Sequence, residues 1–245
     1  MRCKIDLHMH TLDDPKDPHV WHTAWELIDR AAAEGFTALA ITLHWKQFES
    51  DAIRAYAKER GILLLPGVEQ DIEERHVLLI NFPTDVANGI HSFEDLRNAK
   101  TAWGHQAMVI AAHPFFPDAV CLKEKLFDHA DVFDAIEISG FYHRHWDPNK
   151  KARDAATKLG LPLIGNSDTH TLEQFGSIWT EVEFESEPTA DTLIAALKQG
   201  RGTVRSRPLL WHEMAVITYK VVARGYMPWI DYKKRRGATA RAWVE

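Results

Sequence analysis

The sequence has few cysteines and no long hydrophobic run. Cys3 and Cys121 are the only two cysteines, so the sequence holds no disulfide framework, and we expect both to pack as small apolar side chains in a reducing compartment. A membrane-spanning helix needs about 18 or more uninterrupted apolar residues, and no such run occurs. The chain opens on a strand pattern and not on a secretory signal. We therefore expect a cytoplasmic protein with no membrane partner.

The composition is that of a globular chain. Of its 245 residues, 45% are hydrophobic and 26% are charged, and the formal net charge is −6. These values exclude fibrous and disordered classes. A chain of this length buries about three quarters of its extended surface on folding, so no disulfide or other cross-link is required.

Residue types that bind metal ions recur in five short segments, each closing an apolar stretch that predicts a β-strand. A single His-x-His pair is weak evidence, because 14 histidines in 245 residues give about 0.8 such pairs by chance. Five concordant segments in order are far more specific. They are residues 6–10, 42–44, 67–69, 112–114 and 167–170.

Residues 4–208 resemble the polymerase and histidinol phosphatase (PHP) superfamily of metal-dependent phosphoesterases. The resemblance rests on an Asp-x-His-x-His-Thr opening at 6–11, followed by Thr-Leu-His, Gly-Val-Glu, His-Pro and Ser-Asp-Thr-His blocks. Two residues depart from the family pattern. Leu43 stands where the family usually has Asp, which predicts a weaker ion at His44. Asn166 is inserted before Ser167, and we expect that insertion to be benign.

The resemblance implies a di- or trinuclear metal centre in which a carboxylate bridges two ions. The first ion would be held by His8, His10, Glu69 and Asp168, and the second by Glu69, His76 and His113. A third would lie between His44 and His170. Its remaining ligand would come from the segment after the His-x-His pair, where Asp13, Asp14 and His19 all stay open.

This ligand set predicts hydrolysis. Two ions about 3.5 to 4 Å apart can share a hydroxide that attacks phosphorus while the ions neutralise the phosphoryl oxygens. Nitrogen and oxygen ligands without cysteine suit Mn, Fe or Zn. The predicted catalytic residues are Glu69, Asp168 and His170, with His170 helping to protonate the leaving group. His143 and Arg144, in a loop after an apolar strand, are predicted to bind the phosphate.

Helix and strand patterns alternate along the chain. Amphipathic helices are predicted at 22–34, 51–60, 150–159 and 189–199, each followed by a glycine, with seven strand candidates between and around them. Ligands from strands so far apart can meet only around a ring. The prediction is therefore an α/β fold, a distorted (β/α)7 TIM-like barrel over residues 1–208, with the site at its C-terminal mouth.

Residues 209–245 are predicted to form a C-terminal helical extension. The pattern over 211–224 fits a helix that packs on the barrel. The tail that follows contains Trp229, Tyr232 and the basic run 233–236. Basic residues between aromatics could bind a nucleic-acid backbone. The negative net charge favours a solvated tail, a dimer contact or a lid instead.

The leading functional prediction is a metal-dependent hydrolase of phosphate esters, acting on monoesters of small metabolites or nucleotides. A phosphodiesterase or nuclease acting on nucleic-acid ends is the nearest alternative. An amidohydrolase-like enzyme is less favoured, because that family bridges its ions with a modified lysine and here the bridge would be Glu69. A degenerate PHP scaffold, suggested by Leu43, is the non-enzymatic alternative.

Overall fold

A computed structural model describes residues 1–226, and its strands form one mixed sheet in the order β7-β6-β5-β4-β3-β2-β1-β8-β9. Pairing is antiparallel for β1–β8, β3–β4, β4–β5 and β8–β9, and parallel for the other four pairs. The strands are β1 (Arg2–Asp6), β2 (Ala38–Ile41), β3 (Leu63–Ile72), β4 (Arg75–Ile80), β5 (Met108–Ala111), β6 (Ala135–Ser139), β7 (Leu163–Asn166), β8 (Ile178–Glu183) and β9 (Thr203–Ser206).

The sheet curls until its two ends nearly meet. The Thr180 hydroxyl of β8 accepts a hydrogen bond from the Gly165 amide of β7 at 2.8 Å. A Cβ on Gly165 would lie 2.7 Å from the Val204 side chain, so only glycine allows this approach. Near β1, the Leu7 amide donates to Asn166 Oδ1 at 2.9 Å. The predicted distorted barrel is therefore confirmed.

The barrel differs from the predicted one in the number and direction of its strands. Seven strands were expected, and the described residues form nine. Between β3 and β4, Glu73 and Glu74 take φ values of 47° and 65°, and this left-handed turn reverses the chain into a hairpin. The apolar run of β4 consequently pairs antiparallel with both of its neighbours, and not parallel as in a regular (β/α) barrel.

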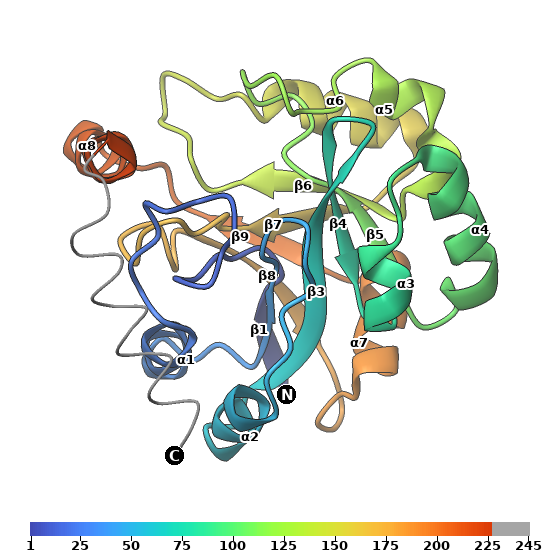
Figure 1. Ribbon diagram of the computed structural model, residues 1–245, viewed down its shortest axis with the longest axis horizontal. Coiled ribbons are helices and arrows are strands. Elements are labelled where there is room, and N and C mark those ends of the chain that lie inside the picture. The colour runs from blue at the N-terminus through green and yellow to red at the C-terminus, as the bar shows by residue number, and fades with distance from the viewer. Residues whose placement is uncertain (227–245) are drawn as a thin grey trace.

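Helices lie around the outside of the strands (Figure 1). The four predicted helices are confirmed, and glycines with φ between 68° and 75° follow them, as the left-handed end of a helix requires. The helices are α1 (Ala24–Ala33), α2 (Asp51–Glu59), α3 (Thr84–Asn88), α4 (Phe93–Trp103), α5 (Lys125–Asp128), a 3₁₀ turn η1 (Ala130–Val132), α6 (Lys150–Leu159), α7 (Ala190–Lys198) and α8 (Trp211–Tyr226).

Three apolar clusters hold the helices to the strands. One joins α7 to inward-facing residues such as Ile5, Leu78 and Ile110, and the other two lie under α3–α6 and under α1 and α2. Full burial of one such aliphatic side chain contributes about 1.5–3 kcal/mol. Cys3 and Cys121 are buried and form no disulfide. Cys3 packs in an apolar cluster, as expected, whereas the Cys121 sulfur lies 3.4 Å from His113 Nδ1.

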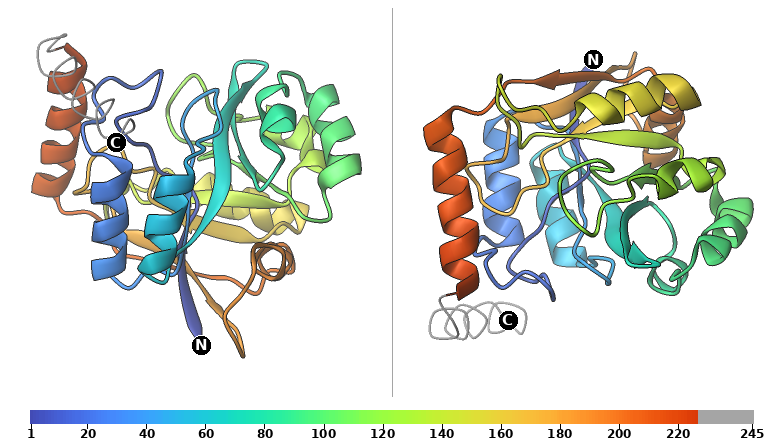
Figure 2. Two further views of the ribbon diagram at one scale, coloured as in Figure 1. Left: turned by 60° about the horizontal axis from the view of Figure 1, so that its bottom comes forward. Right: turned by 90° about the horizontal axis from the view of Figure 1, so that it is seen from above.

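Helix α8 stands at one side of the barrel (Figure 2). Its Met214 and Ile217 pack with Leu209 and with Phe141, which follows β6. Lys220 forms an ion pair with Glu173 in the loop after β7. The division at residue 208 stays a prediction. No helix among the described residues is long and apolar enough to cross a membrane. Trp229, Tyr232 and the basic run 233–236 lie outside the described residues.

Candidate metal centre

The predicted ligands converge at one end of the barrel, around a cavity of about 440 Å³. In Figure 2 (left), this end faces away from the N-terminus. Strand ends and the loops that follow them place most of these side chains, because the carboxyl ends of parallel strands share one rim. Glu69 lies within β3, and His76 lies at the start of the antiparallel β4. The residues brought together are His8, His10, His44, Glu69, His76, His113, Asp168 and His170.

Glu69 lies at the centre of this cluster and divides it into two parts. Its Oε1 atom faces His76 Nδ1 at 2.6 Å and His113 Nε2 at 3.2 Å. Its Oε2 atom faces His44 Nε2 at 3.0 Å and the Nε2 atoms of His8 and His10 at 3.4 Å each. One carboxylate oxygen therefore points into each half of the site, as a bridging ligand requires.

His8 and His10 direct their Nε2 atoms to the same point. Each Nδ1 atom lies within hydrogen-bond distance of a carboxylate, Glu137 at 2.9 Å for His8 and Asp14 at 2.8 Å for His10. When Nδ1 carries the proton, Nε2 has a free lone pair. The two Nε2 atoms nevertheless face each other at 3.3 Å. In that tautomer both rings could bind one cation placed between the two Nε2 atoms.

Carboxylate oxygens complete this set of converging atoms. Asp168 Oδ1 is 3.3 Å from both Nε2 atoms, and Glu69 Oε2 is 3.4 Å from both. Ligands of a tetrahedral ion with bonds of about 2.0–2.1 Å are separated by about 3.3–3.4 Å. Asp168 Oδ1 is also buried without a hydrogen-bond partner. The donor types and spacings therefore fit a divalent metal ion.

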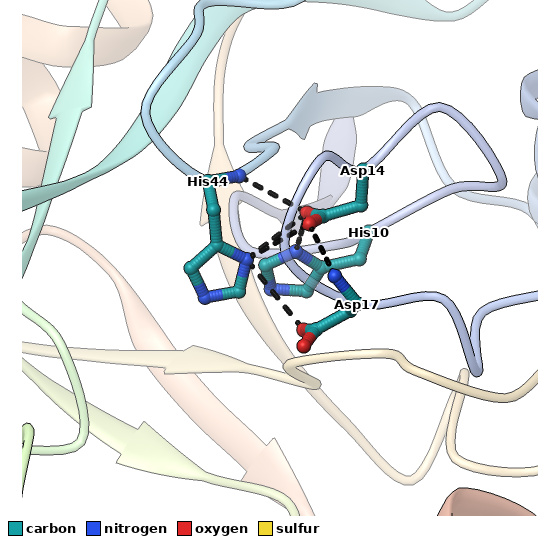
Figure 3. A group of neighbouring side chains, drawn as sticks. All are labelled: His10, Asp14, Asp17 and His44. Carbon is teal, nitrogen blue, oxygen red and sulfur yellow. Dashed lines mark hydrogen bonds and ion pairs between the residues drawn. The ribbon is translucent and has the colours of Figure 1, made fainter. Parts of the chain in front are cut away.

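A further group lies between the loop after β1 and the end of β2 (Figure 3). The Asp14 carboxylate contacts the Nδ1 atoms of His10 and His44, at 2.8 Å and 3.0 Å, and accepts from the His44 amide at 3.0 Å. Asp17 Oδ2 lies 3.5 Å from His44 Nδ1 and 2.8 Å from His170 Nε2. Two carboxylates thus stand where the third site was predicted.

Charge balance in the cluster shifts several pKa values. Burial disfavours the imidazolium of His44, but the Glu69 and Asp14 carboxylates outweigh it and raise the pKa of His44 to about 10. Against the same burial, Asp168 and Asp17 raise the pKa of His170 to about 9. Burial also opposes ionisation of Glu69, yet His76, His8 and His44 hold the pKa of Glu69 well below its usual range. The Glu69 carboxylate is therefore ionised at neutral pH.

Backbone strain marks two of the predicted ligands. His113 has a φ of 26° and Asp168 has a φ of 52°, in a region that non-glycine residues rarely occupy. Such strain concentrates at functional sites, where the surrounding structure enforces it. The His113 amide donates to Glu137 Oε2 at 2.7 Å, which fixes the turn after β5.

Some predicted residues lie elsewhere. His143 is buried against Trp211 of α8, with ring centroids 4.0 Å apart, and Arg144 is exposed and donates to His145. Neither lines the cavity. Their substrate-binding role stays a prediction, one that this geometry does not support. The Leu43 side chain packs in the apolar cluster under α1 and α2, pointing away from the metal-binding residues.

Among the three residues left open for the third site, Asp14 contacts two of the predicted ligands. The His19 ring stacks on His170 at 5.2 Å and lines the cavity, whereas Asp13 does not line it. Sequence reasoning missed Asp17 and Glu137. Asp17 lies three residues beyond Asp14 in the same loop. Glu137 stands inside an apolar strand, and a buried carboxylate there was a usable signal.

A family model described as PHP-associated matches residues 146–201. No curated protein matches the chain.

Three solved structures share the fold at low sequence identity. PsfC from Pseudomonas syringae has a TM-score of 0.64 at 19% identity, over 93% of this chain and 99% of that one. An amidohydrolase from Chromobacterium violaceum, with bound sulfate and no metal, has a TM-score of 0.56 at 19% identity over 81% and 97%. The lesion-specific endonuclease PfuEndoQ from Pyrococcus furiosus has a TM-score of 0.56 at 16% identity, over 83% and 58%.

Proposed function

We propose that this chain belongs to the PHP superfamily and is a metal-dependent hydrolase of phosphomonoesters. The PHP-associated match over residues 146–201, the five ordered ligand motifs and the fold support this proposal. One observation carries the proposal. The nitrogens of His8 and His10 and the oxygens of Glu69 and Asp168 converge at the spacing of metal ligands, and the second oxygen of Glu69 reaches another pair of histidines.

The residues that would hold divalent ions fall into three groups around Glu69. The proposed groups are His8, His10, Glu69 and Asp168; Glu69, His76 and His113; and His44, His170 and Asp17, with Asp14 orienting His10 and His44. Mn, Fe or Zn would suit these ligands. Bound ions would supply Lewis acidity, lowering the pKa of water and neutralising charge on the phosphoryl group.

His170 is the proposed proton donor to the leaving group. Its Nδ1 lies 3.0 Å from the Asp168 carbonyl oxygen and its Nε2 lies 2.8 Å from Asp17 Oδ2, so the ring is held from both sides. Asp168 and Asp17 raise its pKa to about 9 in the absence of an ion, so the ring can donate a proton only when its nitrogens do not hold the third ion. The ring also lines the cavity, within reach of a bound ester.

The shape and charge of the cavity favour monoesters over nucleic acid. Lys16 is the only Lys or Arg that lines the cavity among the described residues, beside four acidic residues, Asp17, Glu69, Asp118 and Asp168. Nucleic-acid backbones are bound by several cations along a track. PfuEndoQ acts on lesions in nucleic acid, and its likeness to this chain is one of fold.

The test is hydrolysis by the Mn²⁺-reconstituted protein, measured on mononucleotides and sugar phosphates in parallel with bis-aryl phosphodiesters and short oligonucleotides. We expect phosphate release from monoesters. Turnover confined to diesters or oligonucleotides would contradict the proposal in favour of a nuclease. Lack of turnover together with failure to retain metal would favour the degenerate scaffold.

A further inference from the structure

One side of the cavity is apolar. Phe116, Phe141, Ile217 and Val221 line it, and we call these four residues the apolar wall. Phe116 and Phe141 meet edge to face, with ring centroids 6.2 Å apart, and Phe141 packs with Ile217 and Val221 of α8. The wall begins beside the metal cluster, because the His113 and Phe116 ring centroids are 6.4 Å apart.

The cavity lining also contains one cationic side chain, Lys16. Lys16 comes from the same loop as Asp14 and Asp17, and its amide donates to Asp14 Oδ1 at 2.9 Å, which fixes the loop. Its ammonium lies 2.7 Å from His76 Nε2, at the edge of the cluster. One ammonium beside a set of metal ligands can bind one phosphoryl group. Within residues 1–226, the lining offers no second Lys or Arg for another phosphate.

From this arrangement we propose that the substrate is a small monophosphate ester with an apolar leaving group, whose hydrocarbon or aromatic part lies on the apolar wall while Lys16 binds a phosphoryl oxygen. This inference rests on the proposed function and specifies its substrate class. Hydrolysis breaks the bond between phosphorus and the ester oxygen. Water supplies the new oxygen on phosphorus, and the leaving group departs as a neutral alcohol after gaining a proton.

A homologous series measures the wall directly. Ethyl, butyl and hexyl phosphate have leaving groups of nearly equal basicity, so differences in their kcat/KM report contact with the protein. Burial of one methylene contributes about 0.8 kcal/mol, which corresponds to an increase of up to about fourfold in kcat/KM per methylene. Glycerol phosphate, which is polar at the same end, should be a poorer substrate than butyl phosphate.

Variants separate the two ends of the substrate. Val221→Ser and Phe116→Ala should flatten the dependence of kcat/KM on chain length. Val222→Ser makes the same change at an exposed position of the same helix, outside the cavity lining, and should keep the dependence. Lys16→Met should lower kcat/KM about tenfold or more for every member of the series, because it removes a charged hydrogen bond to the shared phosphate. Lys46→Met, an exposed lysine two residues beyond His44, is the matched control.

Binding of non-hydrolysable alkyl phosphonates to the Mn²⁺-reconstituted protein, measured by calorimetry, gives a readout that does not need turnover. We expect tighter binding with each added methylene. Equal kcat/KM and equal Kd across chain lengths would overturn the inference and leave the proposed function standing. Lack of turnover on all esters would contradict the proposed function. The change in phosphonate Kd with chain length would then show, independently of turnover, whether the apolar wall binds the alkyl group.

Discussion

The two sides of the cavity are built differently. The metal cluster sits on strand ends of one continuous sheet, and its side chains are held by buried partners such as Glu137 and Asp14. The apolar wall comes from a loop after β5, a loop after β6 and one face of α8. Rigid strand ends suit chemistry that tolerates little displacement, and loops suit the choice of substrate. The comparison suggests that reaction and specificity are encoded in separate parts of the chain.

Glu69→Gln should have the largest effect on the cluster. It removes the charge that faces five imidazoles, so we expect kcat to fall by more than about a hundredfold, beyond the 10–100-fold typical of outer partners. Circular dichroism should show an unchanged fold. Glu59→Gln makes the same chemical change at the exposed end of α2 and should be silent. Near-normal turnover in Glu69→Gln would show that the bridge is misassigned.

Glu137→Gln should have the next largest effect. Glu137 accepts from the His113 amide and from Asn166, and it fixes the His8 ring through Nδ1. Partners of this kind typically change metal affinity or activity by about 10–100-fold. Titration of Mn²⁺ into both proteins measures the change. If the variant bound metal as tightly as the wild type, the proposed orientation of His8 would be wrong.

Metal binding should release protons at pH 7. The pKa values of His44 and His170 are about 10 and about 9 without metal, so both rings carry a proton that must leave before a nitrogen can bind an ion. Apparent affinity should therefore fall as the pH is lowered. Calorimetry in buffers of different ionisation enthalpy counts the protons released. An identical binding enthalpy in all buffers would contradict these charge states.

Arg207→Met should have the smallest effect on stability and should act on the wall side alone. Arg207 holds the start of α8 through two hydrogen bonds of 2.8 Å to Glu213. Because the pair is largely exposed, we expect the free energy of unfolding to drop by less than about 1 kcal/mol. The preference for long alkyl phosphates should weaken, while hydrolysis of ethyl phosphate stays unchanged. If Arg207→Met lost metal, the apolar wall and the metal cluster would not be independent of each other.

The same comparison explains how much the sequence could predict. The cluster could be predicted because each ligand lies next to a recognisable apolar run, and a barrel brings strand ends together whatever their distance in sequence. The direction of each strand was harder to predict, since the apolar run of β4 has the same pattern whether it pairs parallel or antiparallel. Only the left-handed turn at Glu73 and Glu74 decides it.

The apolar wall could not be predicted from the sequence. Phe116, Phe141 and Ile217 are spread over some hundred positions, and nothing in their spacing shows that they meet. His143 and Arg144 illustrate the reverse case. Their residue types suit a phosphate, but the turn that pairs His143 with Trp146 directs them away from the cavity. In this protein, residue type predicts a role in the site only where a neighbouring strand fixes the direction in which the side chain points.

The most direct test of the metal centre is elemental analysis of the purified protein after reconstitution with Mn²⁺ and removal of loosely held ions. Wild type and Glu69→Gln are measured side by side, with Glu59→Gln as the control. We expect two to three ions per chain in the wild type and in Glu59→Gln, and a clear loss of ions in Glu69→Gln. One ion or none in a folded wild-type protein would contradict this expectation.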